Sequence, residues 1–187
     1  MRLKISSITV VVFATALLIA MACSREPSNP GLDTSKNIAK QPAAPLTKEA
    51  RALPAAAFKA QLSLVDPPSR MRPGEKQTVQ VKVKNASDQP WFARGGEVNK
   101  NPDNRFFLAV GNRWLKSDEK TLVTNMDGRY GLQKDLKPGE EEQVSLQITA
   151  PKDPGEYTLE VDVLQEQVAW FSDKGSPTAK AKITVVK

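Results

Sequence analysis

The chain lacks histidine altogether, and only one of its 187 residues, Cys23, is a cysteine. Without histidine, a serine or threonine nucleophile has no imidazole base beside it, and the commonest metal ligand is missing too. No spacing of serine and lysine indicates a substitute pair. A single cysteine also permits no internal disulfide. We therefore predict a protein that is not an enzyme and that is held together by apolar burial.

A strong charge bias is also missing. The whole chain carries a formal charge of +6, but residues 58–187 contain 20 basic and 18 acidic side chains. Proteins that bind nucleic acid usually present a basic stripe with aromatic side chains in between. Here the lysines are scattered singly, and aromatic residues make up only 6% of the chain. We predict no nucleic-acid partner.

The N-terminus has the pattern of an export signal. Arg2 and Lys4 precede an uncharged, mostly apolar run at 5–22, which ends at Ala22 directly before Cys23. Such a run directs export, and the alternative is an uncleaved anchor, because its 18 residues are at the lower limit for spanning a bilayer.

The sequence Ile19-Ala20-Met21-Ala22-Cys23 resembles a bacterial lipoprotein signal. The resemblance implies cleavage between Ala22 and Cys23 and lipidation of the Cys23 thiol. A second acyl chain on the new amino group would make the membrane attachment durable, because one chain alone binds only marginally. Ser24 follows in place of aspartate, which implies the outer membrane if the source is Gram-negative.

Three regions are expected along the chain: a signal peptide at 1–22, the lipidated cysteine with a flexible tether at 23–57, and one domain at 58–187. The tether carries five prolines among Ser, Asn, Lys and Ala and shows no apolar period. A coil of this composition would separate the domain from the membrane by about 30 Å.

The domain shows the two-residue period of half-buried strands. Val79, Val81 and Val83 alternate with polar residues, and similar alternation occurs at 58–64, 144–148, 157–163 and 181–185. Turn sequences separate these runs, among them Asp127-Gly128 and two Pro-Gly-Glu turns that begin at Pro73 and Pro138. We interpret the repeat as one turn type that enters two equivalent strands. The pattern predicts an all-β fold, a single antiparallel β-sandwich of about seven to nine strands.

The segment APKDPGEYTLEVDVLQEQVAWF at 150–171 resembles the C-terminal part of bacterial immunoglobulin-like modules, which occur in cell-surface proteins and beside carbohydrate-active enzymes. In this fold Tyr157 is placed like a tyrosine corner, whose hydroxyl binds the backbone upstream. The inward parity changes between Leu164 and Gln167, which predicts a β-bulge that reorients Trp170.

Trp91, Phe92 and Arg94 form the candidate ligand site, because they follow Pro90 in a predicted loop and an indole ring can stack on a sugar. The alternative is that Trp91, Trp114 and Trp170 are mostly core residues.

No metal or cofactor site is predicted. Asn99, Asn101 and Asp103 resemble the first ligands of a calcium loop, but the glycine and the glutamate that such a loop needs are replaced by Asn104 and Val110. Gly95-Gly96 lacks the context of a phosphate-binding loop.

These features indicate a non-enzymatic envelope lipoprotein. The lipid anchor would bind the membrane, and the immunoglobulin-like domain would bind a protein or glycan of the envelope through loops at one end. The alternative is a structural subunit that pairs with another protein through an edge strand at 178–186.

Overall fold

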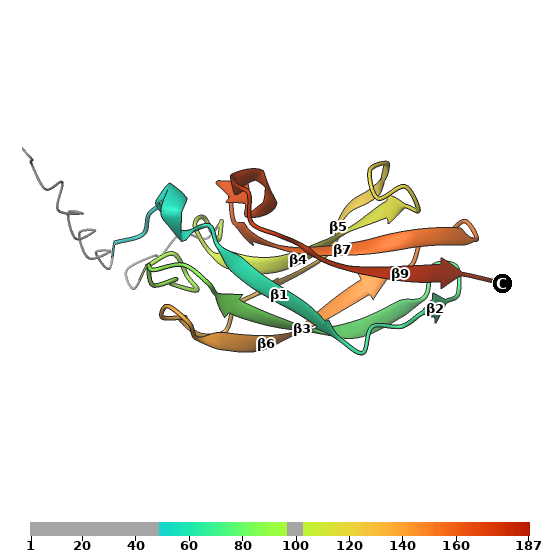
Figure 1. Ribbon diagram of the computed structural model, residues 1–187, viewed down its shortest axis with the longest axis horizontal. Helices are drawn as coiled ribbons and strands as arrows, with labels where there is room; N and C mark the ends of the chain where they lie inside the picture. Colours follow the sequence, from blue (N-terminus) through green and yellow to red (C-terminus); the bar gives the residue numbers. More distant parts are fainter. Residues whose placement is uncertain (1–48, 97–102) are drawn as a thin grey trace, which may run out of the picture. The chain divides into compact units, whose positions relative to one another are not determined.

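The computed structural model describes residues 49–96 and 103–187, which contain nine strands and two short 3-10 turns (Figure 1). The turns are η1 (Ala55–Ala57) and η2 (Ser172–Lys174). The strands are β1 (Ala60–Val65), β2 (Arg70–Met71), β3 (Lys76–Asn85), β4 (Leu108–Lys116), β5 (Leu122–Gly131), β6 (Glu141–Thr149), β7 (Gly155–Gln165), β8 (Ala169–Trp170) and β9 (Ala179–Val185). In these residues, no helix has the length and apolarity to cross a membrane.

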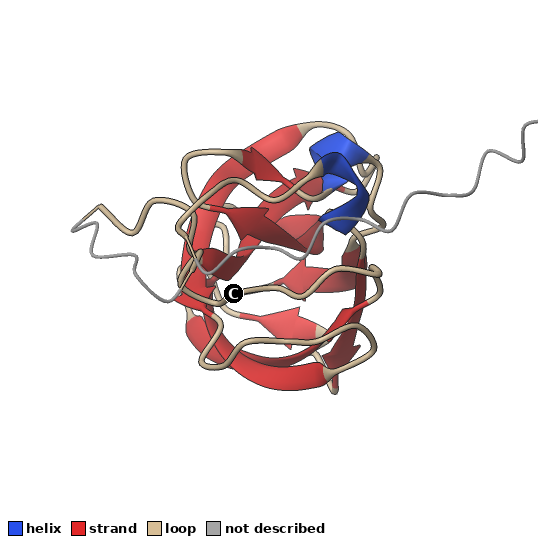
Figure 2. Ribbon diagram, turned by 90° about the vertical axis from the view of Figure 1, so that its left-hand side faces the viewer, coloured by secondary structure: helices blue, strands red, loops and turns tan. Residues whose placement is uncertain are grey.

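The strands form two sheets that face each other (Figure 2). One sheet has the order β1-β3-β6, and the other has the order β2-β9-β7-β4-β5, with β8 beside β7. All pairs are antiparallel except β2 with β9. In immunoglobulin nomenclature the first sheet is A-B-E and the centre of the second is G-F-C, extended by β5. The predicted all-β immunoglobulin-like sandwich is therefore confirmed.

The core lies between the two sheets. Val79, Val81 and Val83 of β3 are buried, as are Val144, Leu146 and Ile148 of β6, while their neighbours in sequence are more exposed. This alternation is as predicted. Strand β7 differs from the expectation of one solvated face, because Thr158 and Asp162 are also buried there. It pairs with β4 and β9 on its two sides.

The Tyr157 hydroxyl donates a hydrogen bond of 2.9 Å to the Asp153 carbonyl. The bond joins the start of β7 to the loop before it, so the predicted tyrosine corner is confirmed.

The parity change after Leu164 has a different cause from the predicted β-bulge. The chain reverses direction: Leu164 pairs with Trp170 and Gln165 with Ala169. The Val168 amide donates to the Gln165 carbonyl over 3.0 Å and closes the turn. A tight hairpin therefore reorients Trp170. The inward and outward alternation of β7 ends at the turn, and a new alternation begins on β8.

The two Pro-Gly-Glu repeats form the same turn, as predicted. The Glu75 and Glu140 amides donate to the Arg72 and Lys137 carbonyls, both over 3.0 Å. In return the glutamate carboxylates accept hydrogen bonds from the Arg72 and Lys137 amides, at 2.6 and 2.9 Å. The glycines have φ of 69° and 84°, as a Pro-Gly turn of this type requires. The turns lead into β3 and β6, which are neighbours in one sheet.

Contacts with the sandwich begin upstream of residue 58, the expected start of the domain. The Arg51 amide donates to the Gly95 carbonyl over 3.2 Å, and the Leu53 amide donates to Gln165 Oε1 over 2.8 Å. Ala57 is fully buried. Residues 51–57, which the sequence places in the tether, therefore contribute to the end of the sandwich.

Strand β5 bends towards β6 at Asp127-Gly128, which the sequence predicted as a turn between strands. The prediction is wrong because both residues lie inside β5, where the register with β4 shifts and Met126 has a φ of 52°. At the bend the Asp127 carboxylate accepts a hydrogen bond from the Thr149 amide of β6. A Cβ atom on Gly128 would lie 2.1 Å from the Gln147 carbonyl oxygen. The bend thus brings the two sheets into contact along one side.

We expect Gly128→Ala to lower the free energy of unfolding by about 2 kcal/mol, because the added methyl group cannot fit against backbone without moving β5 from β6. Gly131→Ala is the matched control in the same strand, since its Cβ would have as its nearest neighbour the Leu108 carbonyl oxygen at 3.8 Å. Urea unfolding of both variants measures the difference. Equal stability of the two variants would show that β5 does not need this close approach.

Candidate binding surfaces

Trp91 does not form the predicted sugar-stacking surface, because its side chain is 0% exposed. Its indole Nε1 donates to the Ala57 carbonyl over 2.8 Å, and its ring meets Phe171 edge-on at 5.1 Å. Its backbone also forms a bridge with Leu136. Trp91 is a core residue that joins the N-terminal segment to the sandwich.

The other two members of the predicted loop site remain near the surface: Phe92 is half-buried and Arg94 is exposed. Trp114 is fully buried, and Trp170 is half-buried with the Arg113 guanidinium 4.1 Å above its ring. Among the tryptophans, the core alternative therefore holds for Trp91 and Trp114.

Several predicted positions lie outside the described residues: Ala22 and Cys23 of the lipoprotein signal, and Asn99 and Asn101 of the calcium-like loop. Within residues 49–96 and 103–187, no three His, Cys, Asp or Glu side chains are grouped so that they could hold a metal ion.

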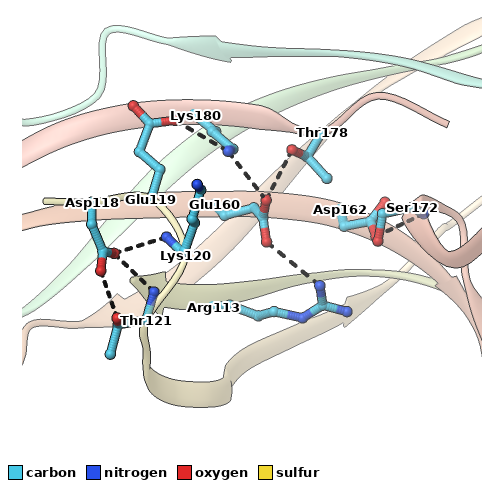
Figure 3. Close-up of polar contacts among 10 residues, drawn as sticks. All are labelled: Arg113, Asp118, Glu119, Lys120, Thr121, Glu160, Asp162, Ser172, Thr178 and Lys180. Carbon is cyan, nitrogen blue, oxygen red and sulfur yellow. Dashed lines mark hydrogen bonds and ion pairs between the residues drawn. The ribbon is translucent and has the colours of Figure 1, made fainter. Parts of the chain in front are cut away.

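A charged cluster crosses the outer face of the second sheet (Figure 3). Glu160 of β7 lies at its centre and contacts Arg113 of β4 at 3.5 Å and Lys180 of β9 at 3.7 Å. The Thr178 hydroxyl donates to Glu160 over 3.1 Å, and Lys180 also reaches Glu119 at 3.2 Å. These pairs join three adjacent strands and the turn after β4, so the cluster has a structural role.

Asp162, also in Figure 3, lies two residues further along β7 and is 1% exposed. Its carboxylate accepts hydrogen bonds from the amides of Val163 at 2.8 Å and Ser172 at 3.1 Å. Burial raises the pKa of Asp162 above its ordinary value of 3.8, although these bonds and Arg113 oppose the change. This carboxylate fixes the start of η2, which follows β8.

Asp118 stabilises the turn between β4 and β5 in the same view. It accepts hydrogen bonds from the Thr121 hydroxyl and amide, at 2.5 and 2.8 Å, and from the Lys120 amide at 2.9 Å. The bonds from Thr121 are the main cause that lowers the pKa of Asp118 to about 2. Asp118 is therefore ionised at neutral pH and acts as a turn acceptor.

Strand β5 is an edge of the second sheet, and it holds most of the large apolar side chains that remain exposed. Leu122 is 53% exposed, Val123 36%, Met126 40% and Tyr130 44%; the other such residue in the described part of the chain is Val168. This strand was not predicted from the sequence, because the bend interrupts the alternation of apolar and polar residues that marks a strand. The adjacent pair Leu122-Val123, next to the polar turn at 117–121, was the available signal.

The predicted edge strand at 178–186 is covered by another strand only at its C-terminal end. Strand β9 pairs with β7 from Ala179 to Val185. On its other side, Thr184 and Val185 pair with Arg70 and Met71 of β2. After β1 the chain passes from the first sheet to the second, where β2 pairs with the C-terminal end of β9.

A polar groove of about 590 Å³ lies where the bent β5 faces β3 and β6. Its residues are Lys76 and Thr78 of β3, Ser145, Gln147 and Thr149 of β6, and Asp127, Gly128, Arg129 and Tyr130 of β5. In β3 and β6 these are the outward-facing positions, with Lys76 opposite Thr149 and Thr78 opposite Gln147. The groove therefore combines hydroxyl, amide and cationic groups with one aromatic ring.

No protein-family model and no curated protein matches the chain. Among solved structures, the CARDB domain of a Pyrococcus furiosus protein is 17% identical, covers 68% of this chain and 94% of its own, and has a TM-score of 0.39. A β-glucosidase from Listeria innocua is 14% identical and covers 69% of this chain, with a TM-score of 0.42. This chain spans only 16% of that β-glucosidase.

The raised pKa of Asp162 predicts a pH-dependent contribution to stability. Because the folded state binds this proton more tightly than the unfolded state, folding loses stability as the pH rises from 3.8 to the raised pKa. Asp162→Asn removes the titration, so the stability advantage of the wild type over this variant should shrink across that interval and stay constant above it. Urea unfolding from pH 3 to pH 8 measures it. An advantage that grows with pH would mean that the pKa is lowered.

Proposed function

We propose that this chain is a non-enzymatic, lipid-anchored envelope protein whose sandwich binds another envelope protein by β-strand addition at β5. The single observation that carries the proposal is the position of Leu122 and Val123. These exposed apolar side chains lie on a strand that has no paired strand on its outer side within residues 49–96 and 103–187.

Strand addition needs an edge with unpaired amide and carbonyl groups, and exposed apolar side chains supply further contact area. Edges that must stay unpaired usually carry lysine, proline or a bulge. The first part of β5, Leu122-Val123-Thr124-Asn125, has no lysine or proline. Its register with β4 shifts once at Val123 and again at Met126–Gly128.

Each edge of the other sheet is occupied at one end. On β6, Asp127 binds the Thr149 amide and Gly128 packs against the Gln147 carbonyl. At the start of β1, the Ser176 hydroxyl bonds to both the amide and the carbonyl of Ala60, at 2.9 and 3.3 Å. Residues 122–125 therefore combine an edge position in the second sheet with exposed apolar side chains.

The anchor part of the proposal rests on the sequence pattern around Cys23 and on the proline-rich segment after it. A tethered domain would stay within the reach of its tether from the membrane. This raises its effective concentration towards proteins of the same envelope and so favours binding to them.

Labelled palmitate should enter the wild-type chain in its bacterial host and be absent from Cys23→Ala, because the thiol is the proposed attachment point. Ser24→Ala, a change at the next residue, should keep the label. Label that persists in Cys23→Ala would refute the lipid anchor and leave strand addition to its own test.

For strand addition, a photocrosslinking amino acid at Thr124 of the full chain should give a discrete adduct with one envelope protein in intact cells. Changing Leu122 and Val123 together to lysine should reduce the adduct about ten-fold, equivalent to about 1.4 kcal/mol of binding free energy, because lysine on an edge opposes strand pairing. Val168→Lys is the matched control, since Val168 is 38% exposed but outside β5. An adduct equally strong in the double variant would contradict the proposal.

A further inference from the structure

The polar groove is a second surface, with a chemistry opposite to that of the β5 edge. Its floor consists of outward-facing side chains of β3 and β6, and its border is β5 after the bend. Tyr130, which is 44% exposed, supplies a ring at that border. An aromatic ring beside hydroxyl and amide groups suits a sugar, which has both apolar faces and hydroxyl edges.

Much of the polar capacity of the floor is not used within the fold. No hydrogen bond inside the described part of the chain engages the side chains of Thr78, Gln147 or Thr149, although each lines the groove. Further along, Gln80 and Ser145 bond to each other across the strands over 3.0 Å. The groove thus presents donors and acceptors that are held on a rigid sheet and are available to a ligand.

The outward-facing side chains of the sheet that forms the floor carry more positive than negative charge, and the groove itself also contains the Asp127 carboxylate. Of the outward-facing residues of β1, β3 and β6, three are lysines and one is a glutamate: Lys76, Lys82, Lys84 and Glu141. Within the groove, the Asp127 carboxylate is bonded to the Thr149 amide, and Arg129 pairs with Glu166 at 2.7 Å. Lys76 forms no ion pair within the described residues.

The spacing of the lysines suits an extended chain. Lys76 and Lys82 lie on the same face of β3, six residues apart, which corresponds to about 20 Å along a strand. A polymer with a negative charge on its repeating units could contact both, whereas a single small anion could contact only one.

We propose that the polar groove binds a polysaccharide that carries carboxylate groups. Tyr130 stacks on one sugar ring, the side chains of Thr78 and Gln147 bond to its hydroxyl groups, and Lys76 pairs with a carboxylate. This inference is independent of strand addition, because it uses the groove and leaves residues 122–125 free.

The test uses the purified full-length chain and three carboxylated polysaccharides in affinity electrophoresis and calorimetry. Two are the polyuronates polygalacturonate and alginate, and the third is hyaluronate, in which a uronate alternates with a neutral sugar. At least one should bind, and 0.5 M salt should weaken its binding because it screens the lysines. Fully methyl-esterified polygalacturonate, the neutral counterpart of the first probe, should bind at least several-fold more weakly. Absence of binding to all three polysaccharides, or equal binding of polygalacturonate and its ester, would overturn the proposal.

Variants locate the site. Tyr130→Ala should weaken polyuronate binding about five-fold, and Lys76→Gln about three-fold. Lys152→Gln, at an exposed lysine outside the groove, should leave binding unchanged. Wild-type affinity in both groove variants would place the ligand elsewhere and refute the site. The Leu122 and Val123 double lysine variant should still bind the polyuronate, so that failure of strand addition and failure of this proposal are distinguishable.

Discussion

The contact between Gly128 of β5 and the Gln147 carbonyl of β6 is the constraint on which both proposed surfaces depend. It needs a residue without a Cβ, and the bond between the Asp127 carboxylate and the Thr149 amide holds the same bend. Because β5 is paired with β4 before the bend and touches β6 at it, one strand contacts both sheets. The open side of the sandwich is closed there without a further strand.

This bend divides β5 into two parts with different surroundings. Before it, Leu122 and Val123 are exposed on an edge that pairs with no further strand in the described part of the chain. After it, Arg129 and Tyr130 border a groove whose floor is polar. The apolar part suits a protein strand and the polar part suits a sugar. The proposed separation of the two ligand types thus follows from the bend within the ten residues of β5.

The outer face of the second sheet differs from these two surfaces, because the hairpin after β7 covers part of it. The hairpin after β7 places Trp170 against Gly111, where an added Cβ would lie 2.8 Å from the ring. Glu160 then joins Arg113 and Lys180 across three strands, and Asp162 accepts the Ser172 amide at the start of η2. Polar groups that satisfy one another in this way stabilise the domain and leave little for a ligand.

Features that depend on residues close together in the chain could be predicted from the sequence. Alternation fixed the inward faces of β3 and β6, the two Pro-Gly-Glu turns were recognisable because proline and glycine set their own backbone angles, and Tyr157 bonds only four residues upstream. The burial of Trp91 could not be predicted in this way, because its partners Ala57 and Phe171 are distant in sequence, and the same holds for the pairing of β9 with β2. Asp127-Gly128 is a bend within a strand because contacts with β6 stabilise it. Contacts between distant segments are set by packing of the whole domain, and no local pattern records them.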